Sequence, residues 1–238
     1  MSLANSSSSL ARKKPLLCYV TDRRSLPVKN PSQTVSALSL KIEQIVTAGV
    51  DFIQIREKDL LARELTSVTR DAVQITASLF QGERRTRILV NDRLDIALSE
   101  GADGVHLAEN GLPIAEAKRL LSERASIASG ERKFLIGASC HSLEAAQAAD
   151  KSGADYLFFG PVFATPSKAA FGAPQGLERL AEVCRSASVP VFAIGGITLE
   201  NAASCVKAGA AGLAAIRLFQ DAPDAEARVR ALGSQLIS

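Results

Sequence analysis

The sequence predicts a single α/β domain, a (β/α)8 TIM barrel, and three observations support this prediction. Short apolar runs alternate along the chain with longer segments of helical period, as in parallel sheets covered by helices. Eight such runs are present, and a helix or a short helical turn follows each one, which favours a closed barrel over an open sheet. The chain of 238 residues has the usual size of one barrel. We therefore expect the barrel to span residues 16–238, after a disordered tail over residues 1–15.

The expected strands are nearly continuous apolar runs, as parallel strands buried on both faces should be. They are the segments 16–21, 51–56, 87–91, 104–107, 133–139, 155–160, 189–194 and 212–217.

Helical period and helix-end signals predict the segments between the strands. Pro113 lies near the first turn of one helix, Ser142 precedes another, and Gly49 and Gly153 follow helix ends. The expected helices are 34–49, 61–80, 92–101, 112–124, 142–153, 176–188, 198–210 and 224–236.

Composition and charge exclude several classes of function. The net charge of +3 equals the charge of Arg12, Lys13 and Lys14, so the expected barrel is neutral. Neutrality argues against a nucleic-acid or membrane-surface partner, and no apolar run is long enough to cross a membrane. The leader MSLANSSSSLARKKP lacks the apolar segment of a secretory signal. We expect a cytoplasmic protein.

Cysteine and histidine usage points the same way. The four cysteines are widely spaced and form no C-x-x-C motif. This pattern indicates small buried side chains in a protein from a reducing compartment. With two histidines in the chain, a histidine-rich metal cage is excluded.

Charged residues follow the second expected strand directly, in the stretch FIQIREKDL (52–60). Barrel enzymes place their chemistry at the C-terminal ends of the strands. Arg56, Glu57 and Lys58 are therefore expected at the mouth of the barrel. Glu57 is interpreted as an orienting partner for Arg56 or Lys58.

Phosphate binding is the simplest purpose that these strand ends share. Arg56, Lys58 and Lys168 supply positive charge, and Thr165 and Ser167 supply hydroxyl groups. The pair Gly195–Gly196 lets backbone N–H groups approach an anion. The alternative is that this pair only makes a tight turn.

Two further residues have an open role at this stage. Asp92, beside Asn91, offers the hard oxygen ligands that suit Mg²⁺ held together with a phosphate, or it caps the next helix. His141 is either a general base, a ligand or a hydrogen-bonded histidine at a strand end. His106, within an expected strand, is interpreted as a core residue.

The residues at the strand ends resemble those of the thiamine phosphate synthase and TenI superfamily, from about residue 16 to the C-terminus. The motifs that carry the resemblance are QIREK (54–58), VND (90–92), GADGVHL (101–107), IGASCHS (136–142), GPVFATPSK (160–168) and AIGGI (193–197).

The resemblance implies an enzyme that joins hydroxymethylpyrimidine diphosphate to a thiazole phosphate, or to its carboxylate. The products would be thiamine phosphate and diphosphate. In such a reaction the bond to diphosphate breaks before the thiazole nitrogen attacks, so the site needs positive charge on the leaving group more than it needs a base. The implied cofactor is Mg²⁺, and the implied partners are the two phosphorylated small molecules; assembly into a homo-oligomer is left open.

The resemblance also assigns roles residue by residue. The diphosphate and pyrimidine site would contain Gln54, Arg56, Lys58, Asn91, Ser139 and Lys168, with Asp92 as a Mg²⁺ ligand. The thiazole phosphate site would contain Thr165, Ser167, Gly196 and Ile216. The residues expected to serve catalysis are Arg56, Ser139, His141 and Lys168.

Three features depart from the family pattern. The sequence HLAENG (106–111) replaces His-Leu-Gly-Gln-x-Asp, so Gly111 stands where the second Mg²⁺ ligand belongs, and Glu109 is the candidate replacement. Arg217 stands where the family usually has Ser, and it would either bind the thiazole phosphate or fill its pocket. The extension DRRSLPVKNPSQ (22–33) is expected to remodel the rim.

The departures keep other readings open. A TenI-type thiazole tautomerase would share the barrel and use a histidine at the position of His141, without diphosphate or metal. The presence of Lys58, Asp92 and Lys168 favours the synthase, because a tautomerase has no use for a diphosphate site. A non-catalytic barrel that binds thiamine-related phosphates, and a phosphosugar-type isomerase, are the remaining alternatives.

Overall fold

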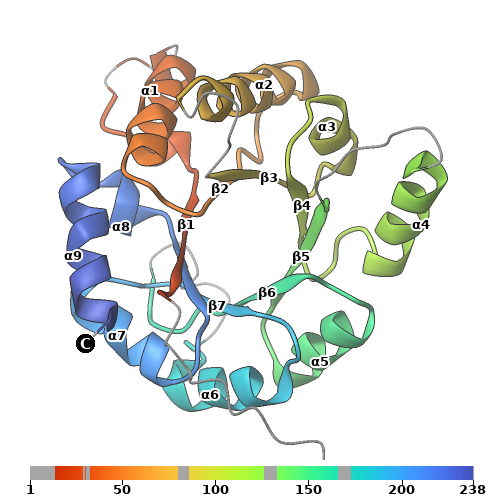
Figure 1. Cartoon of the computed structure of the whole chain (residues 1–238), viewed down its shortest axis with the longest axis vertical. Coiled ribbons are helices and arrows are strands. Elements are labelled where there is room, and N and C mark those ends of the chain that lie inside the picture. The colour runs from red at the N-terminus through yellow and green to blue at the C-terminus, as the bar shows by residue number, and fades with distance from the viewer. Residues whose placement is uncertain are drawn as a thin grey trace, which may run out of the picture.

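Eight parallel strands pair in chain order and close into a barrel, because β8 pairs with β1 (Figure 1). This computed structural model describes residues 14–28, 30, 33–79, 86–125, 133–165 and 173–237. The strands are β1 (Leu16–Val20), β2 (Phe52–Ile55), β3 (Arg87–Asn91), β4 (Gly104–Leu107), β5 (Leu135–Cys140), β6 (Tyr156–Phe159), β7 (Val191–Ile194) and β8 (Gly212–Ala215). The predicted barrel is confirmed.

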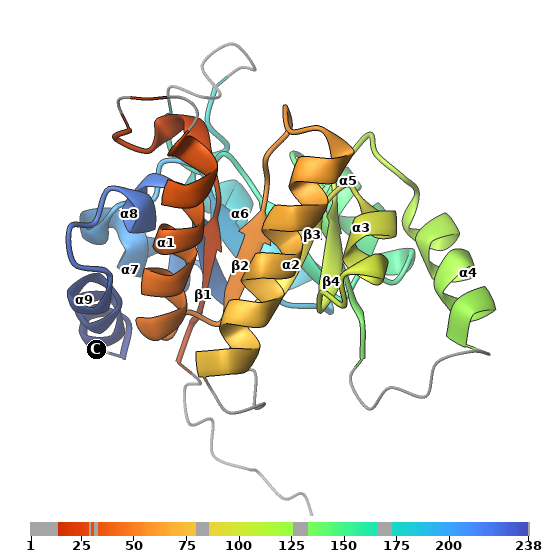
Figure 2. The same ribbon diagram turned by 90° about the horizontal axis from the view of Figure 1, so that it is seen from above.

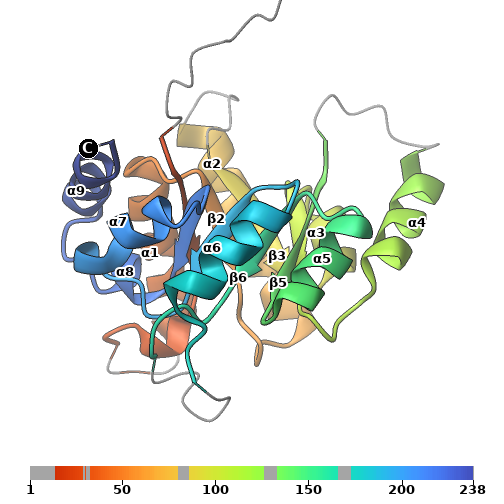
Figure 3. The same cartoon turned by 90° about the horizontal axis from the view of Figure 1, so that it is seen from below.

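Helices form the outer layer and run beside the strands (Figure 2). They are α1 (Thr34–Thr47), α2 (Ala62–Leu79), α3 (Leu94–Ser99), α4 (Ile114–Ala125), α5 (Leu143–Lys151), α6 (Gly176–Ser186), α7 (Leu199–Lys207), α8 (Arg217–Gln220) and α9 (Ala225–Ile237), with a 3-10 turn η1 (Arg23–Ser25). The C-terminal helix α9 packs against α1 and α7, as Figure 3 also shows, and so covers the barrel where the first and last strands meet. Among the described residues, no helix is both long and apolar enough to span a bilayer.

Most of the predicted strands were one or two residues too long, and for two of them the reason can be identified. The seventh begins at Val191 because Pro190 has no N–H to donate to the sheet. The eighth ends at Ala215, and the residues predicted to continue it instead begin the short helix α8. Neither α8 nor η1 was predicted. Of the expected tail, residues 1–13 lie outside the described part, and Pro15 is buried next to β1.

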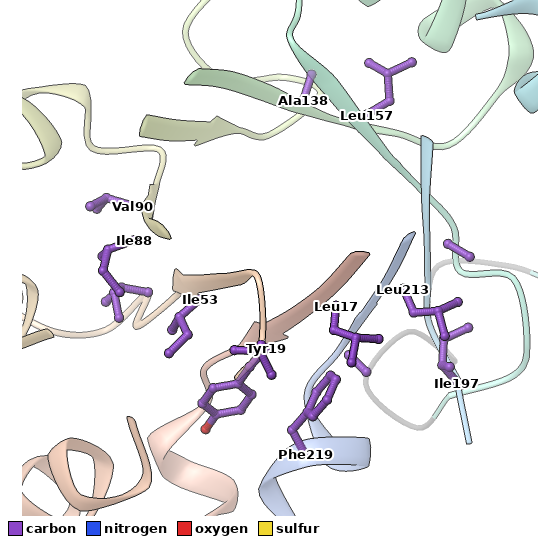
Figure 4. Close-up of a cluster of buried hydrophobic side chains, with 14 of the residues drawn as sticks. Leu17, Tyr19, Ile53, Ile88, Val90, Ala138, Leu157, Ile197, Leu213 and Phe219 are labelled. Carbon is purple, nitrogen blue, oxygen red and sulfur yellow. The ribbon is translucent and has the colours of Figure 1, made fainter. Parts of the chain in front are cut away.

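Two apolar layers lie on opposite sides of the sheet. The outer layer fills the space between strands and helices; Figure 4 shows part of it, including Leu17, Tyr19 and Ile53 on the strand faces turned toward the helices. The inner layer contains the aromatic side chains of Phe52, Tyr156, Phe158 and Phe192, whose neighbouring ring centroids are 5.5–6.3 Å apart. Because this layer fills the barrel interior, the space for a small molecule lies at the C-terminal ends of the strands.

Candidate functional site

A cavity of about 440 Å³ opens at the C-terminal ends of the strands. This size is within the range of small-molecule sites. All the predicted site residues that the structure describes line this cavity: Gln54, Arg56, Lys58, Asn91, Asp92, Glu109, Ser139, His141, Thr165, Gly196, Ile216 and Arg217. Ser167 and Lys168 lie outside the described residues.

The three charged residues that follow β2 have different surroundings. Arg56 and Lys58 line the cavity, whereas the buried Glu57 does not. The Glu57 carboxylate accepts hydrogen bonds from the backbone N–H of Arg23, at 3.1 and 3.2 Å, and from Arg23 Nη1 at 3.1 Å. Glu57 is therefore paired with η1, and the interpretation that it orients Arg56 or Lys58 by direct pairing is wrong.

A second carboxylate extends this rim network. Asp59 accepts two hydrogen bonds of 2.6 Å from the guanidinium of Arg23, and Arg24 lies 2.8 Å away. The hydrogen bonds from Arg23 lower the pKa of Asp59 to about 2. Burial instead raises the pKa of Glu57, with hydrogen bonds from Thr21 and Arg23 acting in the opposite direction. The extension after β1 is thus tied to the loop that carries Arg56 and Lys58.

Asp92 joins the ends of β3 and β4. Its Oδ1 accepts a 2.7 Å hydrogen bond from the backbone N–H of Ala108, and its Oδ2 accepts one of 2.7 Å from Asn91 Nδ2. Asn91 Oδ1 in turn accepts a 3.0 Å hydrogen bond from Gln54 Nε2. Asp92 has a φ of 58°, a backbone conformation that is uncommon outside glycine. The alternative role as a helix cap is wrong, because both carboxylate oxygens bind elsewhere and α3 begins beyond Arg93.

The missing carboxylate at position 111 belongs beside Asp92. A Cβ added to Gly111 would lie 3.1 Å from Asp92 Oδ1, so a side chain there would adjoin that carboxylate. Glu109, two residues earlier, instead accepts a 2.8 Å hydrogen bond from the backbone N–H of His141. His141 Nδ1 is hydrogen-bonded to the carbonyl oxygen of Gly160.

The donor set can be tested against a magnesium ion. Within the described ranges, no cluster of three or more His, Cys, Asp or Glu side chains could hold a metal. Asp92 and Glu109 nevertheless line the same cavity. Mg²⁺ is commonly bound through one or two carboxylates together with substrate phosphates and water. The residues present therefore fit a substrate-held ion and not a complete protein cage.

His106 is a site residue that the sequence reasoning assigned to the core. It is 1% exposed, as expected for a core residue, yet its Nε2 lies 2.9 Å from Ser139 Oγ at the cavity wall. Its Nδ1 lies 3.1 Å from the hydroxyl oxygen of Tyr156. Burial, with a smaller effect of the Arg56 charge, lowers the pKa of His106 to about 3. The alternation of side chains along a strand could have identified His106 as a site residue. His106 pairs with Asn91, and both side chains face the barrel interior.

The glycine pair after β7 forms a tight turn, as the alternative reading expected. Gly195 and Gly196 have φ values of 95° and 64°. A Cβ on Gly195 would lie 2.6 Å from Pro161, and one on Gly196 would lie 2.6 Å from the carbonyl oxygen of Ala164. The turn also borders the cavity beside Thr165 and the exposed Arg217. Glycine is therefore required here by backbone conformation and by close packing, and anion binding remains a prediction.

Taken together, the fold and the cavity define a (β/α)8 barrel with a mouth suited to phosphorylated small molecules. Cations, an acidic residue and a glycine turn border the cavity at the strand ends, and barrels of this fold frequently bind phosphate at the loops after the seventh and eighth strands. The sequence model of the thiamine monophosphate synthase (TMP-TENI) family matches residues 25–219, more than half of the chain. The chain belongs to this family.

Individual relatives agree with this assignment. A candidate thiamine-phosphate synthase of Geobacter sulfurreducens is 46% identical over 191 residues, which cover 80% of this chain and 83% of that protein. The thiamine-phosphate synthase of a Roseiflexus species is 37% identical over 94% of this chain and 86% of its own length. The solved structure of a thiamine phosphate pyrophosphorylase from Pyrococcus furiosus has a TM-score of 0.76, with 33% identity and coverage of 94% and 96%.

Proposed function

We propose that this protein is a thiamine phosphate synthase, which transfers a hydroxymethylpyrimidine group from diphosphate to the nitrogen of a thiazole phosphate. The observation that carries the proposal is that Gln54, Arg56, Lys58, Asn91 and Ser139 line one and the same cavity. Membership of the family supports the same reaction. The partners would be the two phosphorylated small molecules.

Arg56 and Lys58 supply the charge that this reaction needs. As the bond to the diphosphate breaks, negative charge grows on the leaving oxygens, and fixed cations stabilise it. The backbone N–H of Arg56 donates a 2.9 Å hydrogen bond to Thr21 Oγ1, which holds this loop on β1. Lys168, outside the described residues, would add a further cation.

The thiazole phosphate would bind on the opposite side of the mouth. Thr165, Gly196, Ile216 and Arg217 border the cavity there, and Ser167 would join them. Arg217 is exposed and borders the cavity, which supports a role in binding the phosphate over the alternative role of filling the pocket.

Magnesium is part of this proposal. Asp92 would bind the ion together with the diphosphate oxygens, and Glu109 is the next carboxylate in the same cavity. When bound, Mg²⁺ supplies positive charge to the leaving diphosphate. Because Gly111 supplies no carboxylate, affinity for the free ion should be weak.

The tautomerase alternative explains less of the cavity. A tautomerase requires no cation for a leaving group, yet Arg56 and Lys58 both border the cavity. It also gives no reason for the hydrogen-bonded series from Asp92 through Asn91 to Gln54. We therefore favour the synthase.

Diphosphate release tests the proposal. A synthase releases diphosphate together with thiamine phosphate, and much faster when the thiazole phosphate is present than when the pyrimidine diphosphate is present alone. Replacing Arg56 with methionine should lower kcat by about 100-fold, because one charge-stabilising donor is lost. Arg70→Met is the matched control, since Arg70 pairs with Glu100 on the outer helices. A rate of release that does not depend on the thiazole phosphate, or equal rates in the two variants, would contradict the proposal.

A further inference from the structure

The hydrogen-bond ladder between β1 and β2 ends on a side chain beside the cavity. The two strands are parallel, with Val20 opposite Gln54, and the Thr21 N–H donates to the Gln54 carbonyl at 2.9 Å. In a regular parallel ladder the next bond would run from the Arg56 N–H to the Thr21 carbonyl oxygen. The structure instead shows this N–H donating to the side-chain oxygen of Thr21, at 2.9 Å. A hydroxyl group therefore holds the backbone of Arg56 where the sheet ends.

The direction of this hydroxyl is fixed by its two partners. Thr21 is 0% exposed, and a buried hydroxyl hydrogen needs an acceptor. The acceptor is Glu57: burial raises the pKa of Glu57, and a hydrogen bond from the Thr21 side chain is the first contact that acts against this rise. The backbone N–H of Arg56 can only donate, and the carboxylate, ion-paired with Arg23, can only accept. Thr21 therefore accepts from Arg56 and donates to Glu57.

Arg23 in turn holds Glu57 in place. The Glu57 side chain is 1% exposed, and its carboxylate accepts hydrogen bonds from both the backbone N–H and the guanidinium of Arg23. Asp59 binds the same guanidinium through two hydrogen bonds of 2.6 Å. Hydrogen bonds between charged groups are among the strongest in proteins. The carboxylate therefore cannot turn away from Thr21 without breaking several of them.

The side chain of Arg56 has no comparable anchor of its own. Its guanidinium borders the cavity, and within the described ranges it has no hydrogen-bond or ion-pair partner. Burial lowers the pKa of His106 to about 3, and the charge of Arg56 adds to this effect, so the guanidinium is directed toward the buried ring. Because no side-chain contact holds it there, the position of the guanidinium depends on where the Arg56 backbone is held.

We infer that Thr21 is a positioning residue, whose hydroxyl links the Arg23–Glu57 pair to the backbone of Arg56 and so places the guanidinium against the leaving diphosphate. Thr21, Arg23 and Glu57 do not border this cavity, so they act through Arg56 and not on a substrate. A displacement of about 1 Å at a catalytic group can lower a rate by as much as about 100-fold. The role of Arg56 toward diphosphate rests on the proposed function.

The backbone hydrogen bond can be tested without any substrate. Thr21→Val replaces the hydroxyl with a methyl group of similar size. Hydrogen exchange followed by NMR should find the Arg56 amide at least about tenfold less protected in Thr21→Val than in the wild type, because the N–H loses its acceptor. Thr21→Ala should give the same result, and Thr21→Ser, which keeps the hydroxyl, should retain the protection. Equal protection in the wild type and Thr21→Val would overturn the inference, whatever the reaction proves to be.

Thr86→Val is the matched control. Thr86 is also 0% exposed, and its hydroxyl donates to the Val50 carbonyl at 2.7 Å, just before β3 and so at the other end of the barrel. Thr86→Val should leave both the protection of the Arg56 amide and kcat as in the wild type. If Thr86→Val reduced the protection as much as Thr21→Val does, the effect would be a general loosening of the fold and the inference would be wrong.

Turnover tests the consequence for catalysis. Thr21→Val should lower kcat by about tenfold and change the KM for the thiazole phosphate by less than about twofold, because Arg56 acts on the leaving group. In an Arg56→Met background the same substitution should change kcat by less than about twofold, since no guanidinium is left to misplace. Thr21→Ser should keep more than about half of the wild-type kcat.

The two backgrounds separate a positioning role from a structural one. An equal loss of kcat from Thr21→Val with and without the Arg56 guanidinium would overturn the inference, because the loss would then not act through Arg56. If the wild-type protein forms no thiamine phosphate, the proposed function is wrong, and the exchange of the Arg56 amide alone decides whether Thr21 holds this residue.

Discussion

Arg56 and Lys58 line the cavity, whereas Glu57 between them pairs with Arg23. A pattern of charges in the sequence does not predict this difference. The sequence predicted that Arg56 and Lys58 lie at the mouth, because charges after a buried strand need solvent or a ligand. The partner of Glu57 depends on η1, which brings Arg23 within 3.1 Å. His106 was placed in the core on its apolar neighbours, and only the strand register shows that it touches Ser139.

Removing the Arg23 guanidinium should destabilise the protein in a pH-dependent way. The Glu57 side chain is 1% exposed, so an Arg23→Met variant leaves a buried carboxylate without its charge partner. We expect a loss of about 2–3 kcal/mol at pH 7, somewhat below the value for a fully buried pair. Arg24→Met should cost less than about 0.5 kcal/mol, because Arg24 is exposed. Urea unfolding measures both.

The sign of the pH dependence follows from the raised pKa of Glu57. Folded Glu57 keeps its proton above the ordinary value of 4.5, so its contribution to stability falls as the pH rises through the interval between 4.5 and the raised pKa. Loss of Arg23 raises the folded pKa further. The effect of Arg23→Met should therefore be largest above that pKa and shrink as the pH falls toward 4.5. A constant loss across this range would contradict the pairing.

Gly111→Asp should restore a second carboxylate beside Asp92. Its Cβ would be 3.1 Å from Asp92 Oδ1, close enough that the neighbours must shift by a few tenths of an ångström. Because two carboxylates bind Mg²⁺ better than one, the Mg²⁺ concentration for half-maximal activity should fall roughly tenfold. Gly111→Asn is the neutral control of equal size. An unchanged Mg²⁺ requirement would mean that Glu109 already supplies the second charge.

At the scale of elements, the positions of the strands could be predicted from the sequence, but the residues that face the barrel interior could not. Continuous apolar runs indicate parallel strands, but they do not separate the face toward the helices from the face toward the barrel interior. Three inward glycines each pair across the sheet with a large inward residue: Gly104 with Leu135, Gly137 with Tyr156, and Gly212 with Phe192. In each pairing the partner residue occupies the space that a Cβ on the glycine would need. Such compensation appears only once the register is known.

Gly137→Ala tests this packing. Its Cβ would lie 1.9 Å from Cζ of the Tyr156 ring, so the ring must move. We expect a loss of about 2–3 kcal/mol in urea unfolding, typical of an overpacked core. The loss should become much smaller in a Tyr156→Leu background, which a double-mutant cycle quantifies. Gly233→Ala in α9, where the nearest atom is 3.9 Å from the added Cβ, should be neutral or stabilising.

For the whole molecule, chain length and the strand–helix alternation were sufficient to predict the closed barrel. The predicted family is confirmed, because its motifs occur along the same chain and the family match spans residues 25–219. The metal site could not be assigned from the sequence, because the effect of Gly111 depends on the orientation of the Glu109 side chain. In the structure the Glu109 carboxylate accepts a hydrogen bond from the backbone N–H of His141. Assembly into a homo-oligomer and a cytoplasmic location stay predictions.

One measurement tests the central claim most directly. Purified protein is mixed with hydroxymethylpyrimidine diphosphate and thiazole phosphate carboxylate, with Mg²⁺ or with a chelator, and thiamine phosphate is followed by mass spectrometry. The account predicts product only with both substrates, and a rate that falls sharply in chelator. A folded protein that binds thiazole phosphate but forms no thiamine phosphate with Mg²⁺ would contradict the proposed synthase.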